Sequence, residues 1–124
     1  MDRKKILIIE DETSLRHALK EKLTHEGFFV LEGKNGVEGL EVALREHPDL
    51  LLLDLSMPKM GGLEMAKKLR EDAWGKTAKI IILTNISGDM NTVAESMNNE
   101  IFDYFIKSDI KIEDVVIKVK EHLK

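Results

Sequence analysis

The sequence predicts an α/β fold, an open doubly wound sheet of five parallel strands in the order 2-1-3-4-5 with helices on both faces. Three observations predict it: five short runs of consecutive apolar residues, helical apolar spacing between them, and strict alternation of the two patterns along 124 residues. Alternation with short connections requires right-handed crossovers and one parallel sheet. Five strands are too few for an eight-stranded barrel, so the sheet stays open.

The expected strands carry apolar residues on successive positions, which is typical of strands covered on both faces. They span residues 6–9, 28–31, 50–53, 80–83 and 102–106. The last run carries Asp103 and Tyr104 inside it. Alternating patterns typical of hairpins are missing, so we expect no antiparallel pairs.

Between these runs, apolar residues recur at spacings of three and four, as on one face of a helix. The positions are Leu15, Ala18, Leu19 and Leu23; Val37, Leu40, Ala43 and Leu44; Leu63, Ala66 and Leu69; Val93, Ala94 and Met97; and Ile112, Val115, Val116, Val119 and Leu123. Gly27 follows the first set and Pro48 follows the second, where helices commonly end. The pattern therefore predicts five helices and a single domain over residues 1–124.

Composition narrows the function further. The chain is 43% hydrophobic and 34% charged, has no Cys, and carries a formal net charge of -4. Absence of Cys excludes disulfides, thiolate zinc sites and cysteine nucleophiles, and the negative charge disfavours direct nucleic-acid binding. Apolar runs stop far short of the roughly 20 residues that span a bilayer, and no signal peptide is visible, so we expect a cytoplasmic protein without membrane insertion.

Polar residues follow the expected strands where each one ends. Glu10 and Asp11 follow the first strand, Asp54 the third, Thr84 the fourth and Lys107 the fifth. In the predicted order the topological switch lies between strands 1 and 3, and such sheets bind ligands at the carboxyl ends beside the switch. We therefore expect the carboxylates to converge in one cleft, with a hydroxyl and an ammonium arriving from neighbouring strands.

Clustered carboxylates oppose one another's ionisation, so a cation must share the site. Carboxylate oxygens without Cys or His favour Mg²⁺ or Mn²⁺ over zinc, and Mg²⁺ sites commonly serve phosphoryl chemistry. Asp54 is the expected nucleophile, forming an aspartyl phosphate. Lys107 would pair with a phosphoryl oxygen, and the Thr84 hydroxyl would supply a hydrogen bond.

The segments around these residues resemble the receiver domain of bacterial two-component response regulators, which has the flavodoxin-like or CheY-like fold. They are Ile8-Ile9-Glu10-Asp11, Leu52-Leu53-Asp54-Leu55-Ser56-Met57-Pro58-Lys59-Met60-Gly61-Gly62, Ile82-Leu83-Thr84 and Tyr104-Phe105-Ile106-Lys107. The Asp-x-x-Met-Pro-x-Met-x-Gly segment is the most specific, and the resemblance covers essentially the whole chain.

The resemblance implies that Asp54 accepts a phosphoryl group from a phosphohistidine on a sensor histidine kinase or a histidine phosphotransfer protein. It implies a Mg²⁺ site made by Asp11, Asp54 and the backbone carbonyl of Ser56, with Glu10 contributing through water. Thr84 and Tyr104 resemble the switch pair of the family, in which the hydroxyl moves to the phosphoryl group and the ring turns inward.

The resemblance also implies a downstream protein partner on the face built from the fourth helix, the fifth strand and the fifth helix. The same face is a candidate homodimer surface. Such a protein is a phosphoprotein switch and not an enzyme for other substrates, because it catalyses only its own phosphorylation and dephosphorylation.

Three positions depart from the family pattern. Ser108 follows the lysine where a proline is usual, Asn85 stands where a small residue is common, and Glu100-Ile101 replaces the usual Gly-Ala. They motivate an alternative interpretation, a pseudo-receiver that binds proteins but is not phosphorylated. A second alternative is a metal-dependent phosphohydrolase with Asp54 as nucleophile. Such enzymes need a second acid two residues after the nucleophile, where this chain has Ser56, so the sequence disfavours this alternative.

Overall fold

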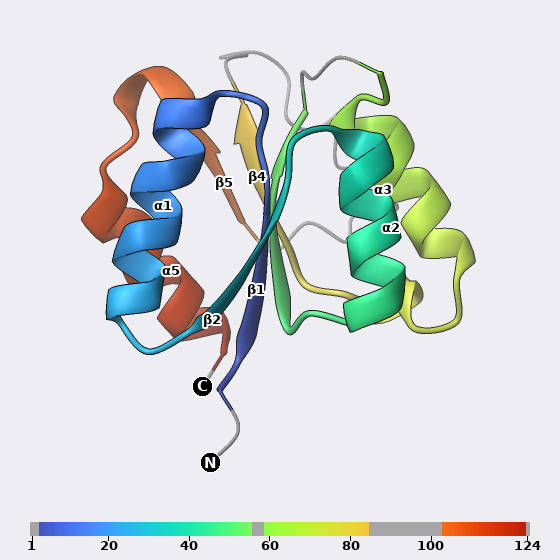
Figure 1. The fold of residues 1–124 in the computed structure, drawn as a ribbon, viewed down its shortest axis with the longest axis horizontal. Coiled ribbons are helices and arrows are strands. Elements are labelled where there is room, and N and C mark those ends of the chain that lie inside the picture. Colours follow the sequence, from blue (N-terminus) through green and yellow to red (C-terminus); the bar gives the residue numbers. More distant parts are fainter. Residues whose placement is uncertain (1–2, 56–58, 85–102, 124) are drawn as a thin grey trace.

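The computed structural model describes residues 3–55, 59–84 and 103–123. Five strands in this part form one parallel sheet in the order β2-β1-β3-β4-β5, which confirms the predicted fold (Figure 1). The strands are β1 (Lys5–Ile9), β2 (Phe29–Gly33), β3 (Leu50–Asp54), β4 (Ile80–Thr84) and β5 (Asp103–Ile106). Every neighbouring pair is parallel, so all five carboxyl ends lie at one edge of the sheet.

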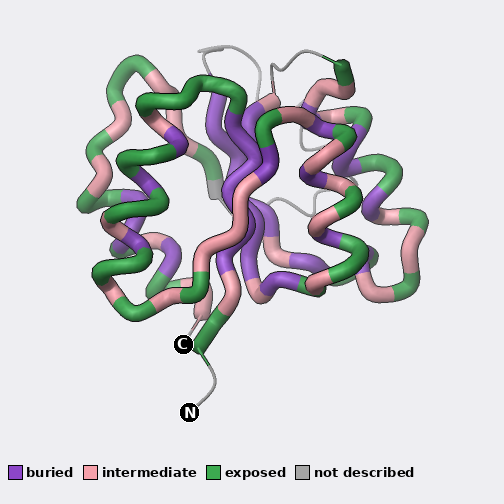
Figure 2. Tube along the Cα trace, viewed as in Figure 1, coloured by how far each residue is buried: buried purple, intermediate pink, exposed green. Residues whose placement is uncertain are grey.

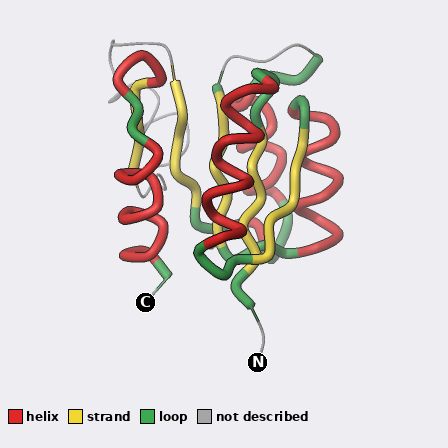
Figure 3. The backbone as a smooth tube through the Cα atoms, turned by 60° about the vertical axis from the view of Figure 1, so that its left-hand side comes forward, coloured by secondary structure: helices red, strands yellow, loops and turns green. Residues whose placement is uncertain are grey.

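Helices cover both faces of the sheet, as the turned view in Figure 3 also shows. The described helices are α1 (Thr13–His25), α2 (Gly36–Glu46), α3 (Gly62–Glu71) and α5 (Ile112–His122), with short 3₁₀ turns η1 (Gly75–Thr77) and η2 (Lys107–Asp109). Helices α1 and α5 lie on one face and α2 and α3 on the other (Figure 1). The helix predicted around residues 93–97 lies outside the described residues.

The core is two apolar layers separated by the sheet. Leu7 and Ile9 of β1 pack with the α2 and α3 side, whereas Ile6 and Ile8 pack with the α1 and α5 side. Successive residues of a strand point to opposite faces, so an uninterrupted apolar run fills both layers. Strands β3 and β4 are accordingly buried along their length and β1 is buried from Ile6 onward (Figure 2), as the sequence predicts.

Strand β2 corrects two expectations. It starts at Phe29 and extends to Gly33, and its burial is incomplete, with Phe29 45% exposed. The predicted order itself explains the exposure, because β2 lies at the sheet edge and has one strand neighbour. Phe28 belongs to the preceding turn, where its N–H donates to the Leu23 carbonyl. The fifth strand begins at Asp103, and residue 102 lies outside the described part.

Helix α2 buries only part of the predicted face, because Ala43 and Leu40 lie at the core but Val37 and Leu44 do not. Val37 and Leu44 are 49% and 38% exposed, and the buried stripe is Gly36, Gly39 and Ala43. A Cβ at Gly39 would lie 2.8 Å from side-chain atoms of β1, so only glycine allows this close approach. Glycine adds nothing to an apolar count, so the spacing of larger side chains located Leu40 and Ala43 correctly but missed Gly36 and Gly39.

A ring stack joins the loops at the end of the sheet opposite the carboxyl ends. His47, in the left-handed region with φ 48°, ends α2. Its ring stacks on Trp74, with centroids 4.5 Å apart and planes inclined by 9°. Neither residue has a sequence pattern that predicts this contact, and it fixes the α2 end against the loop after α3.

Candidate functional site

The structure brings the predicted polar residues together at the carboxyl edge of the sheet. Glu10 and Asp11 follow β1, Asp54 is the last residue of β3, and Thr84 is the last residue of β4. Lys107 follows β5 and begins η2. Glu10, Asp54 and Thr84 are at most 1% exposed. Polar groups buried to this extent are costly without partners, so their placement needs a local explanation.

Lys107 is the centre of the cluster, because it contacts three carboxylates. Its Nζ lies 2.9 Å from Glu10 Oε2, 3.3 Å from Asp54 Oδ2 and 3.4 Å from Glu12 Oε2. The lysine side chain is 7% exposed. Burial acts to lower the pKa of Lys107, but the hydrogen bond from Lys107 to Glu10 and the charges of Glu10 and Asp54 outweigh it and raise the pKa above 10.5. The ammonium is therefore charged at neutral pH.

The acidic cluster, formed by Glu10, Asp11 and Asp54, has carboxylate oxygens that could bind a cation. Carboxylate oxygens of Glu10, Asp11 and Asp54 all lie within 4.8 Å of one another. Glu10 Oε2 accepts from the Glu12 N–H at 3.0 Å and from the lysine, while Glu10 Oε1 is buried and has no hydrogen-bond partner among the described residues. An oxygen-only donor set with an unsatisfied buried carboxylate oxygen fits a hard divalent cation such as Mg²⁺ or Mn²⁺.

Arg16 is a buried residue beside the site that the sequence analysis missed. It is 5% exposed, although the apolar spacing predicted Ala18 for the buried face of α1, and Ala18 is exposed. Arg16 Nη1 donates to the Glu10 backbone carbonyl at 2.9 Å, and Arg16 Nε donates to Glu32 Oε1 at 3.3 Å. Lys20 Nζ also donates to Glu32, at 3.1 Å. An Arg one position after an apolar residue has no sequence signal that predicts burial.

Glu32 provides a pH-dependent stability contribution. Burial acts to raise the pKa of Glu32, but hydrogen bonds and charges of Lys20 and Arg16 prevail and lower it below 4.5. Because the folded pKa is depressed, the contribution is present above pH 4.5 and is lost as pH falls through the folded value. We expect Glu32→Gln to lower the free energy of unfolding by about 1 kcal/mol at pH 7.

Urea unfolding at several pH values measures the effect. The difference between wild type and Glu32→Gln should narrow as the pH falls below 4.5. Glu64→Gln, on the exposed surface of α3, is the matched control and should change little. A wild-type to Glu32→Gln difference that stays constant down to acid pH would contradict the assignment.

The remaining predicted residues divide between described and undescribed parts. Tyr104 lies on β5 and is 45% exposed, and Ser108 is an exposed residue of η2. All peptide bonds in the described ranges are trans, including the one after Lys107. Ser56, Asn85 and Glu100 lie outside the described residues.

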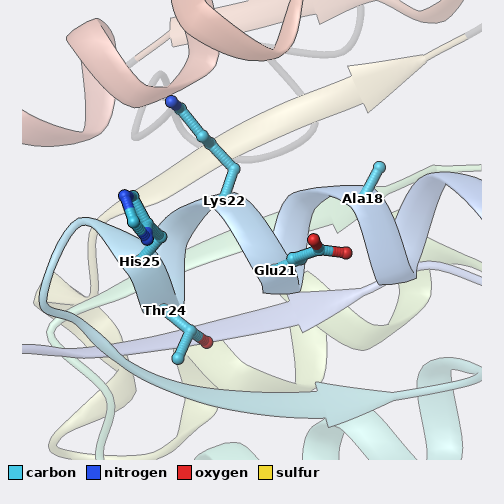
Figure 4. Close-up of a pocket in the computed structure, with 5 residues that line it drawn as sticks. All are labelled: Ala18, Glu21, Lys22, Thr24 and His25. Carbon is cyan, nitrogen blue, oxygen red and sulfur yellow. The ribbon is translucent and has the colours of Figure 1, made fainter.

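A surface depression of 530 Å³ lies along α1, lined by Ala18, Glu21, Lys22, Thr24 and His25 (Figure 4). It contains no member of the acidic cluster and is open to solvent. In the described part of the chain, no helix has the length and apolar character needed to cross a membrane.

The fold and the acid–lysine cluster define a CheY-like α/β protein. The family model for the response regulator receiver domain matches residues 6–120, and the chain belongs to this family. The resemblance to receiver domains inferred from the sequence is therefore confirmed.

Curated relatives agree with this assignment. The chain is 31% identical over 123 residues to sporulation initiation phosphotransferase F of Bacillus subtilis (strain 168), covering 99% of this chain and 96% of that protein. It is 38% identical over 119 residues to the transcriptional regulatory protein SrrA of Staphylococcus aureus, covering 96% of this chain and 47% of SrrA. It is 36% identical to the probable transcriptional regulator ycf27 of Porphyridium aerugineum, covering 86% of this chain and 43% of that protein. The chain thus spans less than half the length of the two regulators.

Solved structures match over nearly the whole chain. A CheY-like response regulator receiver domain protein from Methanospirillum hungatei JF-1 superimposes with a TM-score of 0.87 and 30% identity, covering 98% of this chain and 94% of the other. The response regulator TrrA from Thermotoga maritima, in complex with Mg(2+)-BeF, gives a TM-score of 0.81 and 33% identity, with 96% and 98% coverage.

Proposed function

We propose that this chain is a phosphoacceptor receiver in which Asp54 takes a phosphoryl group from a phosphohistidine. The donor would be a sensor histidine kinase or a histidine phosphotransfer protein. The observation that carries the proposal is the contact of one buried ammonium, Lys107, with the carboxylates of both Asp54 and Glu10. A buried carboxylate beside a fixed positive charge is suited to accept a group whose transfer develops negative charge.

In the proposed transfer, an Asp54 carboxylate oxygen forms a bond to phosphorus as the bond from phosphorus to the histidine nitrogen breaks. The histidine nitrogen keeps the electron pair, and because the other ring nitrogen of the phosphohistidine carries a proton, the ring leaves as neutral imidazole. Lys107 would pair with a phosphoryl oxygen, and the Thr84 hydroxyl would donate a hydrogen bond to the phosphoryl group. Water then attacks the acylphosphate, which returns the Asp54 carboxylate and releases inorganic phosphate. We propose that the protein catalyses only this phosphorylation and dephosphorylation of itself.

The proposed cofactor is Mg²⁺ or Mn²⁺. Asp11 and Asp54 would hold it directly, Glu10 through water, and the Ser56 backbone carbonyl would add a ligand. The convergence of the three acids and the unsatisfied Glu10 oxygen support this donor set. When bound, the cation neutralises negative charge on the transferred phosphoryl group.

The proposed output is a change in affinity for a downstream protein. Thr84 and Tyr104 would form the switch, and the surface would include β5 and α5, where Tyr104 and Ile117 are 45% and 53% exposed. The fourth helix would complete this surface, which is also the candidate homodimer surface. We propose that residues 1–124 form one receiver domain that works in the cytoplasm and does not contact nucleic acid directly.

Incubation of the chain with Mg²⁺ and acetyl phosphate, followed by intact-mass measurement, tests the proposal. We expect a gain of one phosphoryl group that a chelator abolishes. No mass gain with acetyl phosphate or with a phosphohistidine donor would contradict the proposal. That outcome would favour the pseudo-receiver, the alternative that Ser108, Asn85 and Glu100 motivate.

A further inference from the structure

We infer that Arg16, held by Glu32, is a positioning residue. It fixes the turn between β1 and α1 and thereby fixes the positions of the metal-binding carboxylates. The inference rests on the proposed function, because it concerns the same metal site. Arg16 belongs to no motif that defines the site, but it is 5% exposed and bonds directly to the backbone of Glu10.

Both backbone polar groups of Glu10, its N–H and its carbonyl, are hydrogen-bonded and hold the turn in place. The Glu10 N–H donates to the Gly33 carbonyl at 3.0 Å, and the Glu10 carbonyl accepts from Arg16 at 2.9 Å. The Glu10 carboxylate is held separately by Lys107 and the Glu12 N–H. Removing the Arg16 contact would therefore free the peptide that leads into Asp11 while the carboxylate contacts remain.

Arginine suits this position because its guanidinium presents several donors in a fixed planar fork. One arm reaches the Glu10 carbonyl and the Nε reaches Glu32, so α1, β2 and the turn are tied through one group. Lysine has a single charged nitrogen on a flexible stem and does not reproduce this fork. Loss of the Arg16 donor would also leave a buried carbonyl unsatisfied.

The contribution of Arg16 is positional more than electrostatic. Its positive charge is paired with Glu32, which is 3.3 Å away and whose side chain is 26% exposed. Lys20 also pairs with Glu32 but is more exposed, at 48% of its side chain. Because the Arg16 charge is largely compensated by its own partner, a substitution that keeps the charge without the fork should not restore the site. This separates positioning from simple charge neutralisation.

Mn²⁺ binding to the full chain, followed by electron paramagnetic resonance of free Mn²⁺, tests the inference. We expect Arg16→Gln to raise the dissociation constant about tenfold, as loss of groups that orient metal ligands does. Arg16→Lys should weaken Mn²⁺ binding to a similar degree, and Glu32→Gln should weaken it several-fold. Arg45→Gln is the matched control, an exposed arginine paired with Glu41 and Glu46 on α2, and should bind as wild type does.

Urea unfolding of each variant gives the folded fraction, so that affinity is expressed per folded molecule. Wild-type affinity in folded Arg16→Gln would overturn the inference, as would full rescue by Arg16→Lys. If Arg16→Gln does not fold, unchanged affinity in Glu32→Gln overturns it and weakened affinity supports it. Wild-type Mn²⁺ binding that Asp54→Asn leaves unaltered, or no wild-type binding, would instead overturn the proposed metal site and the inference with it.

Discussion

Asp54→Asn is expected to abolish the gain of one phosphoryl group on incubation with Mg²⁺ and acetyl phosphate. The substitution keeps the size of the side chain but replaces the nucleophilic carboxylate oxygen by a neutral amide. Asp54 is 1% exposed at the end of β3 and lies 3.3 Å from Lys107, so the lost group is the one beside the fixed charge. Intact mass and peptide mapping of the acylphosphate measure the effect.

Asp114→Asn is the control for this experiment, because Asp114 is exposed on α5 and lies outside the acidic cluster. It should accept the phosphoryl group at the wild-type level. A full mass gain in Asp54→Asn would move the acceptor to another acid, with Asp11 next to be tested. Partial gain in Asp11→Asn, restored by raising the Mg²⁺ concentration, would be consistent with a metal-binding role for Asp11.

The sequence predicted that Glu10, Asp54 and Lys107 converge because their convergence follows from topology. Once the strand order is known, the residues at the carboxyl ends of β1, β3 and β4 must meet at one edge of the sheet. Glu10, Asp54 and Thr84 are buried there, and Lys107 arrives from β5 as expected. Their proximity required no side-chain detail, only the register of parallel strands.

The features that sequence reasoning missed depend on side-chain packing between distant elements. Arg16 is a charged residue on a helix, and its burial is compensated by Glu32, 16 positions away in sequence. The stack of His47 on Trp74 joins two loops without any periodic pattern. The glycines on the buried stripe of α2 contribute no apolar side chain, so periodicity cannot detect them. Each of these contacts is visible only after the elements are packed.

Gly62→Ala is expected to lower the free energy of unfolding by about 3 kcal/mol and to impair phosphoryl acceptance. A Cβ at Gly62 would lie 2.2 Å from the Asp54 carbonyl oxygen and 2.7 Å from the Leu55 Cα. The Gly62 N–H also donates to the Leu55 carbonyl at 3.0 Å. Because both close contacts are backbone, no side-chain rotation relieves them, and the backbone carrying Asp54 must shift.

The neighbouring glycine provides a control that differs by one position. A Cβ at Gly61 would lie 3.4 Å from the Leu55 carbonyl oxygen, an ordinary contact, and its φ of -67° suits alanine. Gly61→Ala should cost less than about 1 kcal/mol, since Gly61 is the residue before α3 and Ala is a poorer cap. Urea unfolding followed by circular dichroism gives both values. Equal losses of unfolding free energy in the two variants would mean that the close approach of Gly62 to the Asp54 backbone does not account for the effect.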